Sequence, residues 1–141
     1  MIYKNIRKTD YQNIVRFMNV YGFPINENLM KLFHSVNGGK PVGFHFKYEK
    51  NGKYVEDSVY KLLSFDTDEN ENIYDAAEML LDGVTNPVPF AIDENENYIC
   101  YLNGFPENIW LYDMENSELY RIYTENEEIY DAETFFGDME T

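Results

Sequence analysis

Two segments in the second half of the chain decide its fold: Pro87-Val88-Pro89-Phe90-Ala91-Ile92-Asp93 and Asn97-Tyr98-Ile99-Cys100-Tyr101-Leu102. Both are rich in β-branched and aromatic residues, and a short polar turn separates them, which is typical of paired antiparallel strands. We therefore expect strands over 86–93 and 97–102. Two further strand candidates, 109–112 and 119–123, follow along the chain and extend the pattern to an antiparallel meander.

A second hairpin is predicted upstream of these strands. Phe44, Phe46 and Tyr48 alternate on one face, and Asn51-Gly52 is a strong signal for a type I′ turn. The chain then returns through 53–60, and its apolar character continues as far as Phe65. This region therefore supplies two more antiparallel strands.

Four segments carry apolar residues at helical spacing. Thr9 and Gln12 have capping-box spacing at the first, Asn26 begins the second, Gly83 follows the third, and Asp131 is the expected N-cap of the last. The second helix runs into 37–39, Asn-Gly-Gly, which tolerate positive φ. The apolar stripes are Ile14, Phe17, Met18 and Tyr21; Leu29, Leu32, Phe33 and Val36; Ile73, Ala76, Ala77 and Leu80; and Ala132, Phe135, Phe136 and Met139.

The order of these elements is helix, helix, strands, helix, strands, helix, which predicts an α+β fold with helices packed on a central antiparallel sheet. A length of 141 residues is that of one domain, here residues 1–141, with enough chain to bury a sizeable core. Hydrophobic residues make up 44% of the chain, which argues against disorder.

Charge is divided unevenly along the chain. Residues 1–50 carry eight Lys or Arg against three acids, a net charge of +5, whereas residues 51–141 hold the other 23 of the 26 acids and have a net charge of −20. A negative field of this kind speeds association with a basic partner. It also argues against a nucleic-acid ligand, because phosphate binding depends on Lys and Arg that the acidic part of the chain lacks.

The number of cysteines and the distribution of apolar residues along the chain indicate the cellular compartment. Cys100 is the single cysteine, so no intramolecular disulfide can form, and its apolar setting predicts a buried strand position. The opening MIYKNIRKTD has no apolar run after it, unlike a secretory signal. No stretch approaches the ~20 apolar residues of a membrane span. We expect a cytoplasmic protein in a reducing compartment, with no membrane partner.

Enzymatic and metal-binding interpretations lack the necessary residues. His34 and His45 are the only histidines and have no zinc-type partner at a suitable spacing, while the apolar neighbours of Cys100 raise a thiol pKa. Calcium loops starting at Asp66 or Asp93 lack the glycine and glutamate that an EF-hand requires. Carboxylate pairs are inevitable among 26 acids, so a hydrolase is the weakest alternative. We predict no enzyme, no catalytic residue, no cofactor and no metal.

Four motifs follow one another along the chain: the helix into Asn37-Gly38-Gly39; 87–93 leading to 97–100; Ile109-Trp110-Leu111-Tyr112-Asp113; and Ala132-Glu133-Thr134-Phe135-Phe136. In this order they resemble the SUKH superfamily, and its Smi/Knr-type branch most of all. The resemblance covers roughly Phe17 to Met139, and one departure from it is visible. Family members often have two glycines before the Asn of the mid-chain turn, where Asn95 and Glu96 stand here, although Asn95 tolerates left-handed φ.

The resemblance implies a SUKH-like fold and a binding protein rather than an enzyme. Bacterial members are similar in role to immunity proteins, which bind and neutralise a toxin domain encoded nearby, often a nuclease or deaminase. Fungal relatives act as regulatory interaction proteins. The primary hypothesis is therefore a bacterial immunity protein with a basic toxin as its partner, and the alternative is a regulatory adaptor with a different protein partner. Either would be a monomer or a weak homodimer.

The expected partner-binding surface combines carboxylates with aromatic anchors. Two alternative interpretations of these residues are retained. A run of charges can be a solvated face without a partner, and a tyrosine among acidic residues can be a half-buried strand position. The candidate partner-binding residues are Asp66, Asp68, Glu69, Glu71, Asp93, Glu94, Glu96, Tyr112, Asp113, Glu115, Glu125, Glu127 and Glu128.

Overall fold

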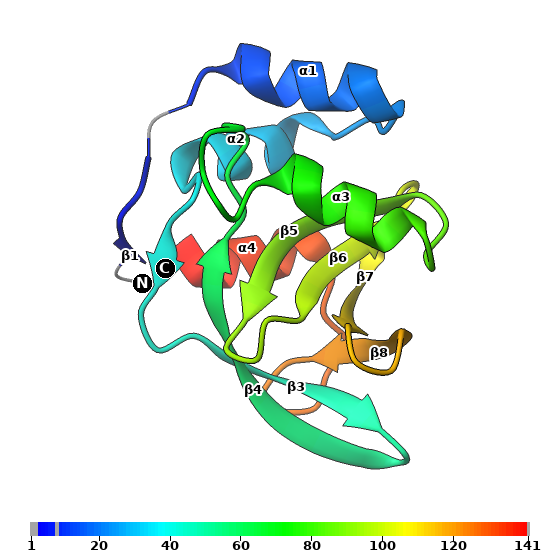
Figure 1. Ribbon diagram of the computed structural model, residues 1–141. Coiled ribbons are helices and arrows are strands. Elements are labelled where there is room, and N and C mark those ends of the chain that lie inside the picture. Colours follow the sequence, from blue (N-terminus) through cyan, green and yellow to red (C-terminus); the bar gives the residue numbers. More distant parts are fainter. Residues whose placement is uncertain (1–2, 8, 141) are drawn as a thin grey trace.

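The computed structural model describes residues 3–7 and 9–140 (Figure 1). Four helices and eight strands follow one another in the described part of the chain, and the α+β prediction is confirmed. The helices are α1 (Tyr11–Tyr21), α2 (Glu27–Ser35), α3 (Ile73–Leu81) and α4 (Ala132–Glu140). The strands are β1 (Tyr3–Lys4), β2 (Lys40–Pro41), β3 (His45–Lys50), β4 (Lys53–Leu62), β5 (Pro87–Asp93), β6 (Tyr98–Leu102), β7 (Phe105–Asp113) and β8 (Glu118–Tyr123).

The predicted meander closes on itself. Strands β3 to β8 pair antiparallel in chain order, and β8 returns to β3 through Lys47↔Tyr123 and Tyr48↔Ile122, which makes a six-stranded barrel. Closure was not predicted, because no local pattern specifies which strands at the two ends of a meander will meet. It satisfies the backbone groups that the outer strands of an open sheet leave unpaired.

The turns and caps follow local sequence signals in most places. Asn51 and Gly52 both have positive φ, at 54° and 76°, as the type I′ turn between β3 and β4 requires. The side chain of Asn26 accepts a hydrogen bond from the Leu29 amide at 2.9 Å, and Asp131 accepts one from the Thr134 amide at 2.7 Å. The predicted N-cap at Asp131 and the predicted start of the second helix near Asn26 are confirmed.

The predicted capping box at the start of α1 is wrong. The N-cap of this helix is Asp10, and its side chain makes no capping hydrogen bond. Thr9 instead accepts a hydrogen bond from Asn13 Nδ2 at 2.8 Å and donates to Asp66 Oδ1 at 3.4 Å. The hydroxyl therefore joins α1 to a distant loop, because tertiary contacts offer it a carboxylate.

Helices cover the barrel on several sides (Figure 1). α3 lies across β5, α4 packs against β7 and α2, and α1 packs on α2. Their inward stripes merge with the barrel interior in one main hydrophobic core, while Met139 has a side chain outside the described residues. Among the described residues, no helix is long and apolar enough to cross a membrane.

Candidate functional site: an acidic groove

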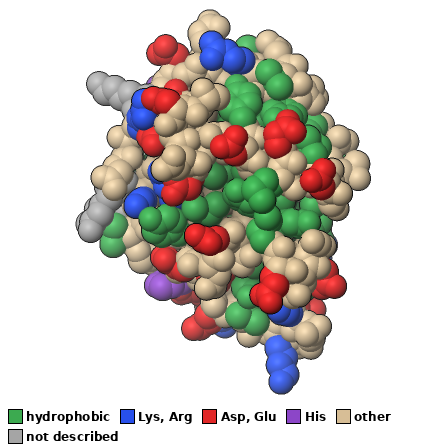
Figure 2. Space-filling view, viewed as in Figure 1, with side chains coloured by type: hydrophobic (Ala, Val, Ile, Leu, Met, Phe, Trp, Pro, Cys, Tyr) green, Lys and Arg blue, Asp and Glu red, His purple; other side chains and the backbone are tan. Residues whose placement is uncertain are grey.

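A groove of about 860 Å³ opens where the start of α3 faces two hairpin turns. We call it the acidic groove. No lysine or arginine of the described chain lines it. Seven carboxylate residues do: Glu71, Asp75, Asp93, Glu94, Glu96, Asp113 and Glu115. Figure 2 shows acidic and hydrophobic side chains interspersed on the face that carries α3. The structure therefore brings together carboxylates that are up to 44 positions apart in the sequence.

Strand pairing places the two turns side by side. β6 pairs with both β5 and β7, and Tyr98 at its start lies opposite Tyr112 near the end of β7. The β5–β6 turn and the β7–β8 turn consequently meet at one end of the barrel. Asn97 Oδ1 accepts a hydrogen bond from the Met114 amide at 3.1 Å and ties the two turns together.

Each turn is held by the aspartate that ends its first strand. Asp93 Oδ1 accepts hydrogen bonds from the amides of Asn95 and Asn97 at 2.9 and 2.7 Å. Asp113 Oδ1 does the same for Glu115 and Asn116 at 2.9 and 3.2 Å. These hydrogen bonds fix the backbone conformation of both turns, which carry the exposed side chains of Glu94, Glu96 and Glu115.

Two of the candidate partner-binding residues are buried, and for these two the prediction of a partner contact is wrong. Asp93 is 1% exposed and Tyr112 is 5% exposed, so neither can contact a partner across the surface. The hydroxyl of Tyr112 packs against Gly83, where an added Cβ would lie 2.7 Å from it. Asp93 orders the β5–β6 turn, whereas Tyr112 packs in a second hydrophobic cluster with Leu80 and Cys100. Sequence reasoning missed this because alternation alone does not show how deep a strand end lies.

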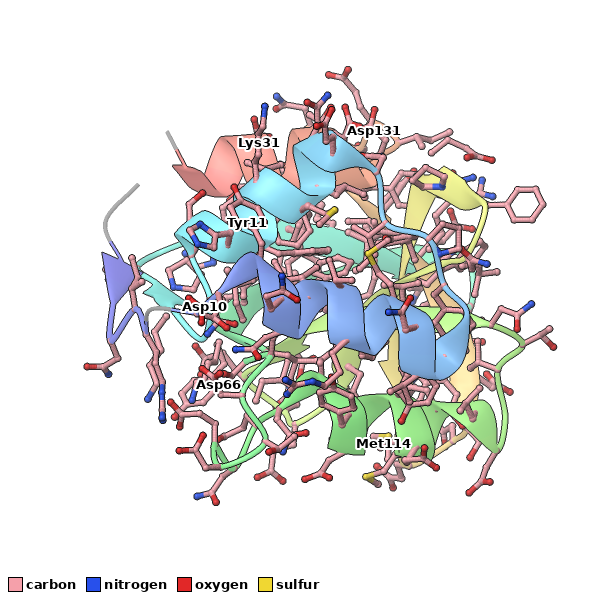
Figure 3. All side chains as sticks on the ribbon, turned by 90° about the horizontal axis from the view of Figure 1, so that it is seen from above. Asp10, Tyr11, Lys31, Asp66, Met114 and Asp131 are labelled. Atoms are coloured by element: carbon pink, nitrogen blue, oxygen red, sulfur yellow. The ribbon has the colours of Figure 1, made fainter. Side chains whose placement is uncertain are left out.

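The acidic loop after β4 is divided between two surfaces. Arg7 lies 2.8 Å from Asp68, 3.0 Å from Glu69 and 3.6 Å from Asp66. All three candidates therefore share one ion-pair partner within the chain, whose single positive charge offsets one of their three negative charges. Figure 3 shows Asp66 beside the start of α1. Glu71 lies on the other side, in the acidic groove, 3.6 Å from Lys61 Nζ.

Glu125, Glu127 and Glu128 lie in the connection between β8 and α4 and do not line the acidic groove. All three are exposed, and Glu127 is 3.7 Å from Lys47 Nζ. The predicted contact surface is thus split into the groove and this separate turn.

Three carboxylates of the groove act on the rest of the chain only through charge, as Glu94 does on Lys40 and Asp57. The side chains of Glu94, Glu96 and Glu115 are exposed and make no hydrogen bond or ion pair with the residues that the structure describes. By contrast, Asp113 lies 3.7 Å from Lys50 Nζ and Asp75 accepts a hydrogen bond from Asn72. Within the groove, the carboxylates that have no hydrogen-bond or ion-pair partner among the described residues therefore lie on the two hairpin turns.

The groove also has an apolar side that sequence reasoning missed. Met79 of α3 is 48% exposed, and its sulfur accepts a hydrogen bond from the Tyr98 hydroxyl at 3.7 Å. Met114 comes from the β7–β8 turn, and Figure 3 shows it against α3. Asp75 and Met79 are four residues apart on one helix face, and this spacing outside the buried stripe is the signal that could have identified them.

The β5–β6 turn differs from the expectation in one backbone angle. Glu96, rather than Asn95, has the left-handed conformation, with φ of 65°. This is one of the two positions where family members often carry glycine, which adopts such angles without strain. The chain keeps a charged side chain at a strained position on the rim of the acidic groove.

A buried carboxyl pair lies beneath this turn. Asp57 of β4 is 9% exposed, and its Oδ2 has no hydrogen-bond partner among the described residues in the ionised form. Burial raises the pKa of Asp57 to about 8, with further contributions from a hydrogen bond with Asp93 and from the charge of Asp93. Asp57 does not line the acidic groove, so the pair does not present two carboxyls to a substrate.

We predict that Asp57→Asn stabilises the protein increasingly as pH rises from about 4 to about 8. The pKa of Asp57 is raised above the ordinary value of about 4. The native state therefore binds the Asp57 proton more tightly than the unfolded chain does. The stability that this proton contributes to the parent protein is lost as pH rises from about 4 to about 8. Asparagine cannot ionise and can still donate to Asp93. We expect a gain of about 2 kcal/mol at pH 8, measured by urea unfolding; an equal difference at pH 5 and pH 8 would contradict the prediction.

The remaining reactive side chain is sequestered. Cys100 is 0% exposed, and burial raises the pKa of its thiol to about 12. The predicted buried strand position is confirmed. A thiol in this setting is a poor nucleophile, because the thiolate is the reactive form.

Comparison with known proteins places the chain in a family. Neither the curated proteins nor the solved structures contain a significant match. The model of the SMI1 / KNR4 family (SUKH-1) matches residues 8–132, which include every residue that lines the acidic groove. Members of this family are generally non-enzymatic immunity or interaction domains. The chain belongs to the SMI1 / KNR4 family (SUKH-1).

Proposed function

We propose that the protein is an immunity protein of the bacterial cytoplasm that binds a basic toxin domain, such as a nuclease or deaminase, through the acidic groove. The observation that carries this proposal is the groove lining, which combines seven carboxylate residues, six of them not buried, with no lysine or arginine among the described residues. Family membership supports a protein partner in general. Once bound, the immunity protein would inhibit the toxin by covering the toxin's substrate cleft.

The proposed mechanism is electrostatic. A nuclease holds phosphate in a cleft lined by Lys and Arg, so glutamates on the two turns can occupy the positions of substrate phosphates. The turns are already ordered by Asp93 and Asp113, which limits the entropy lost on binding. The net charge of −15 adds long-range attraction that speeds the encounter.

A regulatory adaptor is the alternative, because the same groove would suit a basic housekeeping protein. Genomic context separates the two. A gene beside a large secreted protein with a variable C-terminal domain favours the immunity protein, and an isolated gene favours the adaptor.

The test is a stopped-flow titration against the toxin domain encoded by the neighbouring gene, at rising salt. We expect an association rate constant on the order of 10⁸ M⁻¹s⁻¹ at low salt, falling steeply as salt screens the groove. Tight binding should be accompanied by loss of toxin activity. Absence of binding to any neighbouring gene product, or an association rate that does not change with salt, would count against the proposal.

A further inference from the structure

We infer that the acidic groove recognises an arginine side chain of its partner and prefers it to lysine. The inference rests on the proposed function, because it takes the groove as the partner-binding site, and it adds the chemistry of the group that enters. Three features of the groove support it: the size of the groove, its unpaired carboxylates, and the thioether and aromatic side chains among them.

The size of the groove suits a side chain with its flanking peptide. A volume of about 860 Å³ is far greater than that of a single ion. It falls within the roughly 300–1,000 Å³ of pockets that take ligands of drug size. One long side chain and parts of its neighbours in the partner would fill it.

The carboxylates surround the space from different elements. Glu94 and Glu96 stand on the β5–β6 turn and Glu115 on the β7–β8 turn, and none of the three side chains is bonded to another described residue. Arginine presents five N–H donors in a planar fork and can hydrogen-bond to carboxylates on two sides at once. Lysine has a compact ammonium with three donors and would form hydrogen bonds with fewer of these carboxylates.

The apolar side chains favour a guanidinium further. Met79 is 48% exposed and Tyr98 is half-buried, and the two are joined by the 3.7 Å hydrogen bond described above. Met114 adds a second thioether from the neighbouring turn. A guanidinium is weakly hydrated and stacks on aromatic faces, whereas an ammonium is strongly hydrated and loses more on leaving water.

The protein already binds its own arginines in both of these ways. Arg7 is held by three carboxylates of a single loop, with its closest contacts at 2.8 and 3.0 Å. Arg121 lies over the ring of Trp110, with its guanidinium carbon 5.1 Å from the ring centroid. The acidic groove offers carboxylates and an aromatic ring at one place, with no arginine of the described chain lining it.

The experiment uses the full chain labelled with ¹⁵N and three peptides that differ at one position. Each peptide has a Gly-Ser background with a central arginine, lysine or citrulline, and amide shifts are followed by NMR. We expect the arginine peptide to shift the amides of residues 94–98 and 113–116. Its affinity should be about fivefold higher than that of the lysine peptide, the factor that about 1 kcal/mol of cation–π contact gives. The uncharged citrulline peptide should not bind.

Two matched variants test the apolar contact. Tyr98→Leu keeps an apolar strand residue but removes the ring, and it should reduce the preference for arginine to near unity. Tyr54→Leu removes another half-exposed ring, on the β3–β4 hairpin outside the groove, and should leave the preference unchanged. The spectrum of each variant also reports whether the fold is intact.

Equal affinity for the arginine and lysine peptides, or shifts that lie outside the groove, would overturn the inference. Its failure can be distinguished from that of the proposed function. If glutamate variants of the groove abolish toxin binding while the peptides are not discriminated, only the inference is wrong. If arginine is preferred but no neighbouring toxin binds, the proposed function is wrong.

Discussion

Replacing Phe135 with alanine is expected to cost about 4 kcal/mol of unfolding free energy, within the range measured for buried phenylalanines. Phe135 is 0% exposed, and it joins α4 to the interior of the barrel. Removing the ring leaves a cavity that several other rings border, and rigid strands limit how far the site can collapse. The rings in contact with it are those of Phe44, Phe46, Phe90, Tyr130 and Phe136.

Urea unfolding of the variant and of the parent protein measures this cost. Phe105→Ala is the matched control, because Phe105 is 60% exposed and its truncation should change stability by less than about 0.5 kcal/mol. If Phe135→Ala costs no more than the control, α4 does not anchor the core as described. If the variant is wholly unfolded, Phe135→Leu should restore the fold with a smaller loss.

Charge reversal at the three free glutamates of the acidic groove is expected to weaken partner binding about 10³-fold, or about 4 kcal/mol. The variant combines Glu94→Lys, Glu96→Lys and Glu115→Lys. Each substitution replaces an attractive charge with a repulsive one at the proposed interface, and both the association rate and the lifetime of the complex should fall. Stability should be retained, since none of these side chains is bonded to a described residue.

The control reverses the same number of charges elsewhere. Glu125→Lys, Glu127→Lys and Glu128→Lys together give the same net charge but lie outside the groove. This variant should slow association modestly through the weaker overall field and leave the lifetime of the complex almost unchanged. If both triple variants weaken binding equally, net charge and not the groove accounts for recognition. If only the control loses binding, the partner docks on the β8–α4 connection.

Much of the fold could be predicted because it depends on short-range signals. Asn51-Gly52 specifies its turn through backbone conformations that few other residues adopt, and the stripe of Ile73, Ala76, Ala77 and Leu80 specifies a helix with one buried face. The capping of α1 could not be predicted in this way. Thr9 finds a carboxylate 57 positions away, and only the assembled chain brings that group within reach.

The candidate site was predictable in composition but not in arrangement. The carboxylates of the groove were expected at the surface, and Glu71, Glu94, Glu96, Asp113 and Glu115 line the groove. Asp66, Asp68 and Glu69 have the same chemistry, yet all three share an ion pair with Arg7, and Asp93 is buried. Charge can be counted along a sequence, whereas the availability of each charge depends on which cation and how much solvent the fold places beside it.

The amino-acid sequence by itself determined the α+β class, most helices and strands, the family resemblance and the strongly acidic character of residues 51–141, because each depends on composition or on periodicity over a few residues. Only the tertiary structure decided that the meander closes into a barrel, that two hairpin turns and α3 enclose one acidic groove, and that its free charges are Glu94, Glu96 and Glu115. The physical reason is that strand pairing between distant segments sets which side chains become neighbours. Electrostatic strength then follows from distance and burial, which no local pattern contains.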